Sequence, residues 1–153
     1  MIRYLNNHPK IGAIEPLQLE EKTHLPIPTG SHHNTPLTDF FELTWLGRKL
    51  ANRPLLNHFR LRSRSRNKTW VADVICDAAL MAKTSLLRQL QGYDLNLKLY
   101  YTENDLCRRI QNSGLANIHF SGAKLYHRLS ASTQTQPWQL ISSIYALDAF
   151  YYF

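Results

Sequence analysis

The segment Leu99–Ile110, Leu-Tyr-Tyr-Thr-Glu-Asn-Asp-Leu-Cys-Arg-Arg-Ile, constrains the fold more than any other part of this chain. Its apolar residues Leu106 and Ile110 repeat at the i, i+4 spacing that a half-buried helix requires. Thr102 is a good N-cap for such a helix, and Gly114 suits the position just after its C-terminus. We therefore predict that a strand or loop leads into a short amphipathic helix near Thr102.

Two acids, Glu103 and Asp105, fall in the first turn of this predicted helix. Acids in a first turn offset the positive end of the helix dipole, and the pattern alone favours this structural interpretation. A carboxylate at the start of a helix can also be aimed at a substrate. The two acids are therefore candidate catalytic residues as well as candidate capping charges.

The basic character of the chain points to an anionic partner. Its 153 residues suit one domain, and a net charge of +7 fits nucleic acid, a membrane surface or a phosphate-bearing small molecule. Much of the charge lies between Arg60 and Lys68, and such a run is typical of a solvated loop. No aromatic residue interleaves with this run, so specific binding of nucleic acid by base stacking is poorly supported.

The cysteines and the apolar segments predict a cytoplasmic protein. Cys76 and Cys107 are too few and too far apart for a disulfide framework or a metal motif, and free thiols fit a reducing compartment. No apolar run approaches the ~18 residues of a membrane span, and the N-terminal residues do not resemble a signal peptide. The aromatic segment Phe150–Phe153 suggests docking or peripheral contact at the inner face of the cell membrane.

Strand-like and helix-like patterns alternate along the chain, which is typical of an α/β or α+β fold. The predicted strands cover residues 11–14, 70–76, 78–82, 117–120 and 123–127, and the other predicted helices cover residues 1–7, 37–50, 85–91 and 138–153. We divide the single domain 1–153 into an irregular Pro/His/Arg-rich insertion (15–69), a core (70–132) and a C-terminal helix (137–153). His24, His32 and His33 lie in the insertion without a metal-binding spacing motif.

Two further residues stand out by their position. Asp77 interrupts an apolar run, where an acid is costly unless it is paired or faces a cleft, although a loop or bulge there explains it more simply. His127 ends a predicted strand before a serine-rich loop, which makes it a site candidate, although a lone histidine is more often structural.

Over about 60 residues, from Asp73 to Ser132, a series of short pieces follows in a definite order: Val74–Ala78, Gln91–Asp94, Tyr100–Arg109, Gly114, Leu125–His127 and Ser130–Ser132. This series resembles the family 2 glycosyltransferases of the GT-A fold, especially their rhamnosyltransferase-like and galactofuranosyltransferase-like branch. In that family the corresponding pieces are a hydrophobic-Gly-Ala strand, a Gly-Gly-Phe-Asp turn, a Tyr-x-Glu-Asp-x-Asp-Leu-Cys-x-Arg segment, a glycine and a strand that ends in His before a serine-containing loop.

The resemblance implies roles for seven residues. The family's catalytic aspartate falls on Glu103, which would take the proton from the acceptor hydroxyl during inverting transfer, and Asp105 is the family's second acid. His127 matches a histidine that helps hold Mn²⁺ or Mg²⁺ in metal-dependent members. The residues expected to bind substrate are Trp70, Asp77, Tyr101 and Arg108. Relatives usually have glycine in place of Asp77.

Two departures qualify the resemblance. The metal-binding Asp-x-Asp motif of the family is absent from this sequence, and we expect that the family's N-terminal donor-binding half is missing. The resemblance therefore implies a partial GT-A fold, a mixed sheet with flanking helices, that represents only the acceptor-side portion. We expect that the donor, a nucleotide-diphospho-sugar, and a divalent metal belong to the complete enzyme. The acceptor would be a polysaccharide or a lipid-linked glycan.

We expect that this chain alone does not transfer sugar. Two other interpretations stay open from the sequence. One is a non-catalytic remnant or interaction domain that keeps the fold, because the donor-binding half is missing. The other, less favoured, is a basic module that binds nucleic acid without sequence specificity.

Overall fold

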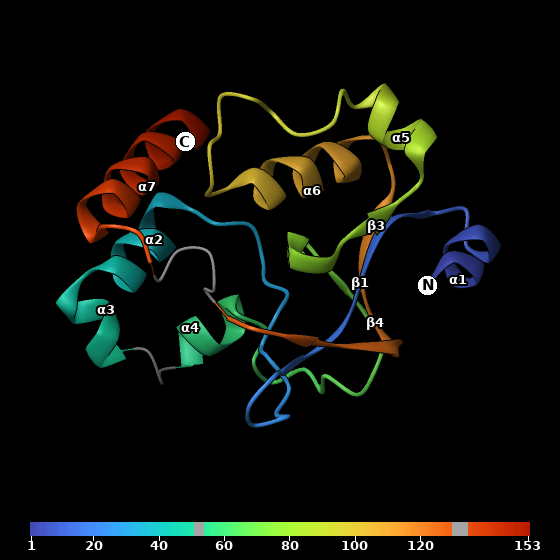
Figure 1. Ribbon diagram of the computed structural model, residues 1–153, viewed down its shortest axis with the longest axis horizontal. Coiled ribbons are helices and arrows are strands. Elements are labelled where there is room, and N and C mark those ends of the chain that lie inside the picture. Colours follow the sequence, from blue (N-terminus) through green and yellow to red (C-terminus); the bar gives the residue numbers. More distant parts are fainter. Residues whose placement is uncertain (51–53, 130–134) are drawn as a thin grey trace.

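A four-stranded mixed sheet with strand order β2-β4-β1-β3 forms the centre of the protein (Figure 1). The computed structural model describes residues 1–50, 54–129 and 135–153. Strands β1 (Ile11–Glu20) and β4 (Ala116–His127) are parallel, whereas β2 (Trp70–Ala72) and β3 (Met81–Ala82) pair antiparallel to β4 and β1. The α/β class and the flanked mixed sheet predicted from the sequence are confirmed.

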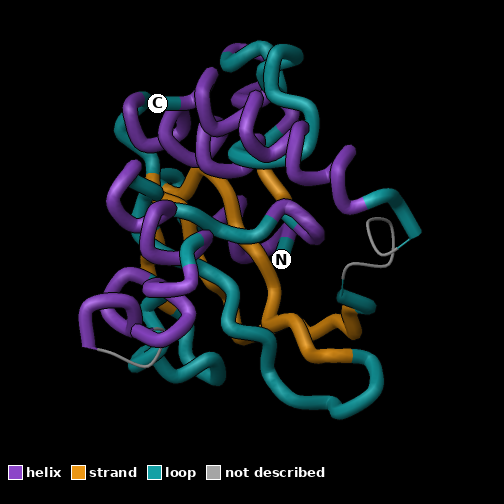
Figure 2. The backbone as a smooth tube through the Cα atoms, turned by 90° about the vertical axis from the view of Figure 1, so that its left-hand side faces the viewer, coloured by secondary structure: helices purple, strands orange, loops and turns teal. Residues whose placement is uncertain are grey.

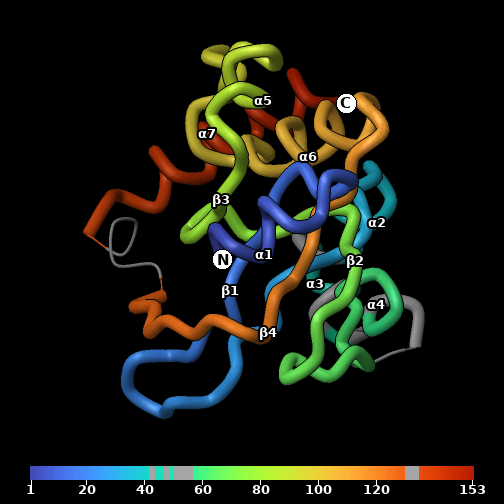
Figure 3. Tube along the Cα trace, turned by 90° about the vertical axis from the view of Figure 1, so that its right-hand side faces the viewer, coloured from blue at the N-terminus to red at the C-terminus, as the bar shows by residue number. Residues whose placement is uncertain are grey.

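The helices form two groups around this sheet, with α1 packed separately against it (Figures 1 and 3). Figure 2 shows the strands running through the interior between helices and long loops. One group consists of α5 (Thr84–Gln89), α6 (Thr102–Asn112) and α7 (Trp138–Tyr152). The other consists of α2 (Pro36–Leu43), α3 (Trp45–Leu50) and α4 (Pro54–Phe59), and α1 spans Ile2–Asn7. No helix in the described ranges combines the length and apolarity needed to cross a bilayer.

Two apolar clusters hold helices against opposite faces of the sheet. On one face, α6 packs Leu106 and Ile110 against Ala13 of β1, with all three side chains fully buried. On the other face, α1 inserts Leu5 against Ile14. The i, i+4 spacing of the α6 residues produces this packing, as predicted, because it places both side chains on one helical face.

Strand β1 is longer than predicted, because the sequence suggested that Pro16 would end it. The strand continues to Glu20, and its register against β4 shifts between Pro16, opposite Phe120, and Leu17, opposite Lys124. Proline lacks an N–H for the ladder and is tolerated at such irregularities. The same shift explains why 117–120 and 123–127 form one strand instead of two separated by a turn.

The segment 15–69 is more regular than predicted. Besides the second half of β1, it contains α2, α3 and α4, and the helix predicted over 37–50 is broken at Thr44, which has an extended backbone. The strand predicted over 70–76 is shorter, because β2 pairs with β4 only as far as Ala72, opposite Asn117, close to where β4 begins. Residues 77–79 form a 3₁₀ turn, and residues 130–132 of the predicted core lie outside the described residues.

A buried acid of the C-terminal helix holds the backbone that leads into α6. Asp148 of α7 is 1% exposed, and its carboxylate accepts hydrogen bonds of 2.8–3.0 Å from the backbone N–H groups of Lys98, Leu99 and Tyr100. Burial opposes ionisation, but these three hydrogen bonds outweigh it and hold the pKa of Asp148 below its ordinary value. The acid therefore fixes the chain just before α6.

We predict that Asp148→Asn lowers the free energy of unfolding by about 2–3 kcal/mol at pH 7, because a charged acceptor for three N–H groups is lost. The effect shrinks as the pH falls, because a carboxylate with a lowered native pKa stabilises the fold only above that pKa. Urea unfolding at pH 7, 5 and 3 measures both. Glu21→Gln, which changes an exposed acid, is the control. An equal loss at every pH would contradict this account.

Candidate active site

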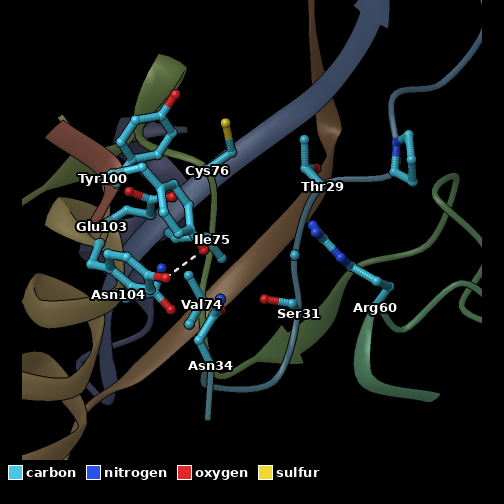
Figure 4. A pocket seen from close by; sticks show the side chains of 14 residues that line it. Thr29, Ser31, Asn34, Arg60, Val74, Ile75, Cys76, Tyr100, Glu103 and Asn104 are labelled. Carbon is cyan, nitrogen blue, oxygen red and sulfur yellow. Dashed lines mark hydrogen bonds between the residues drawn. The ribbon is translucent and has the colours of Figure 1, made fainter. Parts of the chain in front are cut away.

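A polar cavity of about 350 Å³ opens beside the N-terminal end of α6 (Figure 4). Four other stretches of chain complete it: the loop after β1, the segment after β2, the turn after α4 and Tyr145 of α7. The lining residues are Pro28, Thr29, Gly30, Ser31, Asn34, Arg60, Val74, Ile75, Cys76, Tyr100, Tyr101, Glu103, Asn104 and Tyr145. Because most of these side chains carry hydrogen-bonding groups, the cavity suits a polar ligand.

The entry to α6 is fixed by Tyr101. This residue, not Thr102, is the N-cap, and its backbone has a left-handed φ of 60°, which is costly for a residue with a side chain. Its buried phenol hydrogen-bonds to Asp39 of α2 and, at 2.5 Å, to Tyr145 of α7. Burial and these partners raise the pKa of Tyr101 far above its ordinary value. Three helices thus set the direction in which α6 starts.

Glu103, the predicted base, lies on the cavity wall at the first turn of α6. Burial, followed by the negative charge of Asp77, raises the pKa of Glu103 from an ordinary 4.5 to about 7. The Thr102 hydroxyl lies 3.1 Å from the carboxylate of Asp77 and 3.2 Å from that of Glu103. A carboxyl group with this pKa can both take up and release a proton near neutrality.

A second acid, Glu15, lies fully buried behind the cavity. Its carboxylate accepts hydrogen bonds from the Thr29 hydroxyl at 2.8 Å and from the Cys76 backbone N–H at 2.7 Å, and both donor residues line the cavity. The same carboxylate lies 3.0 Å from His119 Nδ1. Sequence reasoning missed this acid, although it stands in the apolar run of β1, the same signal that drew attention to Asp77.

The partners of Glu15 form a closed buried network. His119 Nε2 lies 2.9 Å from the backbone carbonyl of Arg66, which can only accept, so this nitrogen carries a proton. The His119 ring stacks on Trp70 at 4.9 Å, and Arg66 lies over the Trp70 ring at 5.0 Å. The network supports the cavity floor and leaves Trp70 outside the cavity lining.

Asp77 and Tyr101, two of the residues expected to bind substrate, both lie near Glu103, but in different ways. Tyr101 lines the cavity, whereas exposed Asp77 acts on Glu103 by its charge and through the Thr102 hydroxyl. Arg108 does not line the cavity and lies over the Tyr152 ring at 4.7 Å.

Asp105 faces away from the cavity and pairs with Arg109 one turn along the helix at 2.5 Å. A carboxylate committed to an i, i+4 ion pair in the first helical turn matches the structural interpretation of this acid. The structure thus separates the two acids of α6: Glu103 lines the cavity, and Asp105 is paired outside it.

His127 lies far along the sheet from the buried acid behind the cavity. It pairs with Glu20 at the end of β1, five residues and therefore about 16 Å along the strand from Glu15. In the described ranges, no three His, Cys, Asp or Glu side chains gather in a group that could hold a metal ion. His32 and His33 instead contact Asp73 and Gln111 at 2.7 and 2.6 Å. The divalent metal therefore stays a prediction.

Comparisons with family models, with curated proteins and with solved structures gave no match to this chain. The function of the chain is therefore inferred from the geometry and charge of the cavity.

We predict that the Glu103 carboxyl group titrates near pH 7 and that Glu103→Gln stabilises the protein above that pH. An acid whose native pKa is raised from 4.5 to about 7 destabilises the fold increasingly between these pH values, by up to about 3 kcal/mol. The variant should gain this amount at pH 8 and almost nothing at pH 4. Carbon-13 NMR of the carboxyl group and urea unfolding measure both quantities.

Asp105→Asn is the matched control, because it changes an acid two residues away that does not line the cavity. It should show no stabilisation at pH 8. A Glu103 midpoint below pH 5 would contradict the prediction.

Proposed function

We propose that the cavity binds the hydroxyl-bearing acceptor of a glycosyl transfer and that Glu103 is the general base. On this proposal the chain is the acceptor-side portion of an inverting family 2 glycosyltransferase with a partial GT-A fold. The observation that carries the proposal is the position of the Glu103 carboxyl group on the wall of a polar cavity, where burial and the charge of Asp77 raise its pKa to about 7. Its ionised form is available at neutral pH to accept a hydroxyl proton.

The proposed step is a single displacement. The Glu103 carboxylate takes the proton of an acceptor hydroxyl while that oxygen forms a bond to the anomeric carbon of the donor sugar. The bond from this carbon to the diphosphate oxygen breaks, and the nucleoside diphosphate leaves with the bonding electron pair. Glu103 ends protonated, and the configuration at the anomeric carbon is inverted. A divalent metal, when bound in the complete enzyme, would neutralise the leaving diphosphate.

The remaining wall residues favour a sugar over an apolar ligand. Ser31 and Thr29 supply hydroxyl groups, Asn34 supplies an amide, and Tyr100 supplies an aromatic ring. Saccharides are commonly held by such hydrogen-bonding groups beside an aromatic surface, with few polar groups fixing the orientation. The position and protonation of Glu103 would then select which hydroxyl reacts.

We predict that at least one of the methyl glycosides of glucose, galactose and rhamnose binds to the protein. Its affinity should change at least about threefold between pH 6 and pH 8. The cause is the ionisation of Glu103. The protonated carboxyl group can donate a hydrogen bond to the ligand, whereas the carboxylate can only accept one from a ligand hydroxyl. Saturation-transfer NMR measures the affinities. The pH dependence should disappear in Glu103→Gln and persist in Asp105→Asn.

Absence of binding, or a pH dependence that survives Glu103→Gln, would contradict the proposal. Binding by the wild type and by Glu103→Gln with equal affinity at both pH values would instead favour a non-catalytic interaction domain.

We also predict that the purified chain alone neither transfers nor hydrolyses sugar from UDP-, GDP- or dTDP-sugars. The sequence lacks the Asp-x-Asp motif, and the donor site is assigned to the part of the enzyme that this chain does not resemble. Release of nucleoside diphosphate, followed with Mn²⁺ and with Mg²⁺, is the measurement. Turnover that is lost in Glu103→Gln would show that the chain is a complete transferase.

A further inference from the structure

The two sides of the cavity carry opposite charges (Figure 4). Glu103 and Asn104 lie on one side, at the start of α6, and Arg60 lies on the other, beside Ser31 and Thr29. In this view the guanidinium end of Arg60 points back toward the Thr29–Ser31 segment. A cation and an acid on opposite walls give the cavity a direction along which a ligand can be oriented.

Asn104 is the clearest sign that a ligand completes this cavity. The residue is 6% exposed and lines the cavity, yet its Oδ1 atom has no hydrogen-bond partner among the described residues. A buried acceptor without a donor is costly, and such groups are uncommon in folded proteins. A ligand that donates an O–H or N–H group to Asn104 would remove this cost.

We infer that the ligand of this cavity is an anionic saccharide, with its carboxylate or phosphate at Arg60 and a donor group at Asn104 Oδ1. The inference rests on the proposed function, because the same ligand would present its reacting hydroxyl to Glu103. Charge fixes the orientation: an anionic group is repelled by ionised Glu103 and attracted by Arg60. The neutral, hydroxyl-bearing end therefore lies at α6.

The charge of the whole chain supports an anionic ligand. The net charge is +7, and Arg60 begins the basic run that ends at Lys68. A guanidinium group binds carboxylates and phosphates through paired, charge-assisted hydrogen bonds, which are about twice as strong as neutral ones. A neutral sugar would not form such a contact.

Three ligands test the inference: methyl glucoside, methyl glucuronoside and glucose 6-phosphate. They share the glucopyranose ring, and at carbon 6 they carry a hydroxyl, a carboxylate and a phosphate. Titration calorimetry at pH 8 should show at least one anionic ligand binding about tenfold more tightly than the neutral glycoside. The preferred anion distinguishes a carboxylate from a phosphate site. Arg60→Gln should abolish the preference, whereas Arg64→Gln, an exposed arginine of the same run, should keep it.

Asn104→Leu tests the second contact. Leucine is similar in size but accepts no hydrogen bond, so all three ligands should bind about five- to tenfold more weakly. The melting temperature should stay equal or rise, because the unpartnered oxygen is removed. A lower melting temperature with unchanged affinity would assign Asn104 a purely structural role and overturn its part of the inference.

The outcomes separate this inference from the proposed function. Equal affinity for neutral and anionic ligands, with the pH dependence from Glu103 intact, would overturn the anionic assignment and leave the general base in place. The saccharide assignment would be overturned if inorganic phosphate alone bound as tightly as the anionic saccharides and Asn104→Leu left their affinities unchanged. Failure of every saccharide to bind would overturn both.

Discussion

The buried contact between Glu15 and His119 is the interaction on which the rest of the structure depends. It joins the two central parallel strands, and both side chains are 0% exposed. The carboxylate oxygens of Glu15 also receive hydrogen bonds from Thr29 and from the backbone of Cys76, which orders two walls of the cavity. Breaking one partner of such a pair typically costs about 3–5 kcal/mol, because the other is left buried and uncompensated.

Helix α6 is positioned by contacts that come from distant parts of the chain. Asp148 of α7 holds the three backbone N–H groups before the helix, and Asp39 of α2 holds the Tyr101 phenol at its first turn. Because Glu103 follows Tyr101 by two residues, any change in these contacts moves its carboxyl group. The catalytic candidate is therefore supported by residues that do not themselves react.

Glu103 and Asp105 show how position decides the chemistry of identical functional groups. Both are carboxyl groups in the first turn of one helix. Glu103 turns toward a cavity, where burial and the charge of Asp77 raise its pKa. Asp105 turns outward and pairs with Arg109. A buried acid beside a second negative charge destabilises the fold at neutral pH and is suited to proton transfer, a combination that is common at functional sites.

Several elements follow from local sequence because short-range physics decides them. The period of Leu106 and Ile110 predicts α6 and its buried face, and Gly114, with a φ of +81°, follows its end. The β-rich run at Trp70 and the apolar run at Ile11 predict strands. Their predicted lengths were wrong, because pairing partners and the register shift at Pro16 decide where a strand stops.

The sequence by itself determined the α/β class, the helix that carries Glu103 and Asp105, and the resemblance that singled out Glu103. Only the tertiary structure decided that Glu103 lines a cavity while Asp105 does not, that Asn104 is left without a donor among the described residues, and that Glu15 and Arg60 belong to the same region. The reason is physical. Helix period is local, whereas burial, charge neighbours and hydrogen-bond partners depend on segments that are many residues apart.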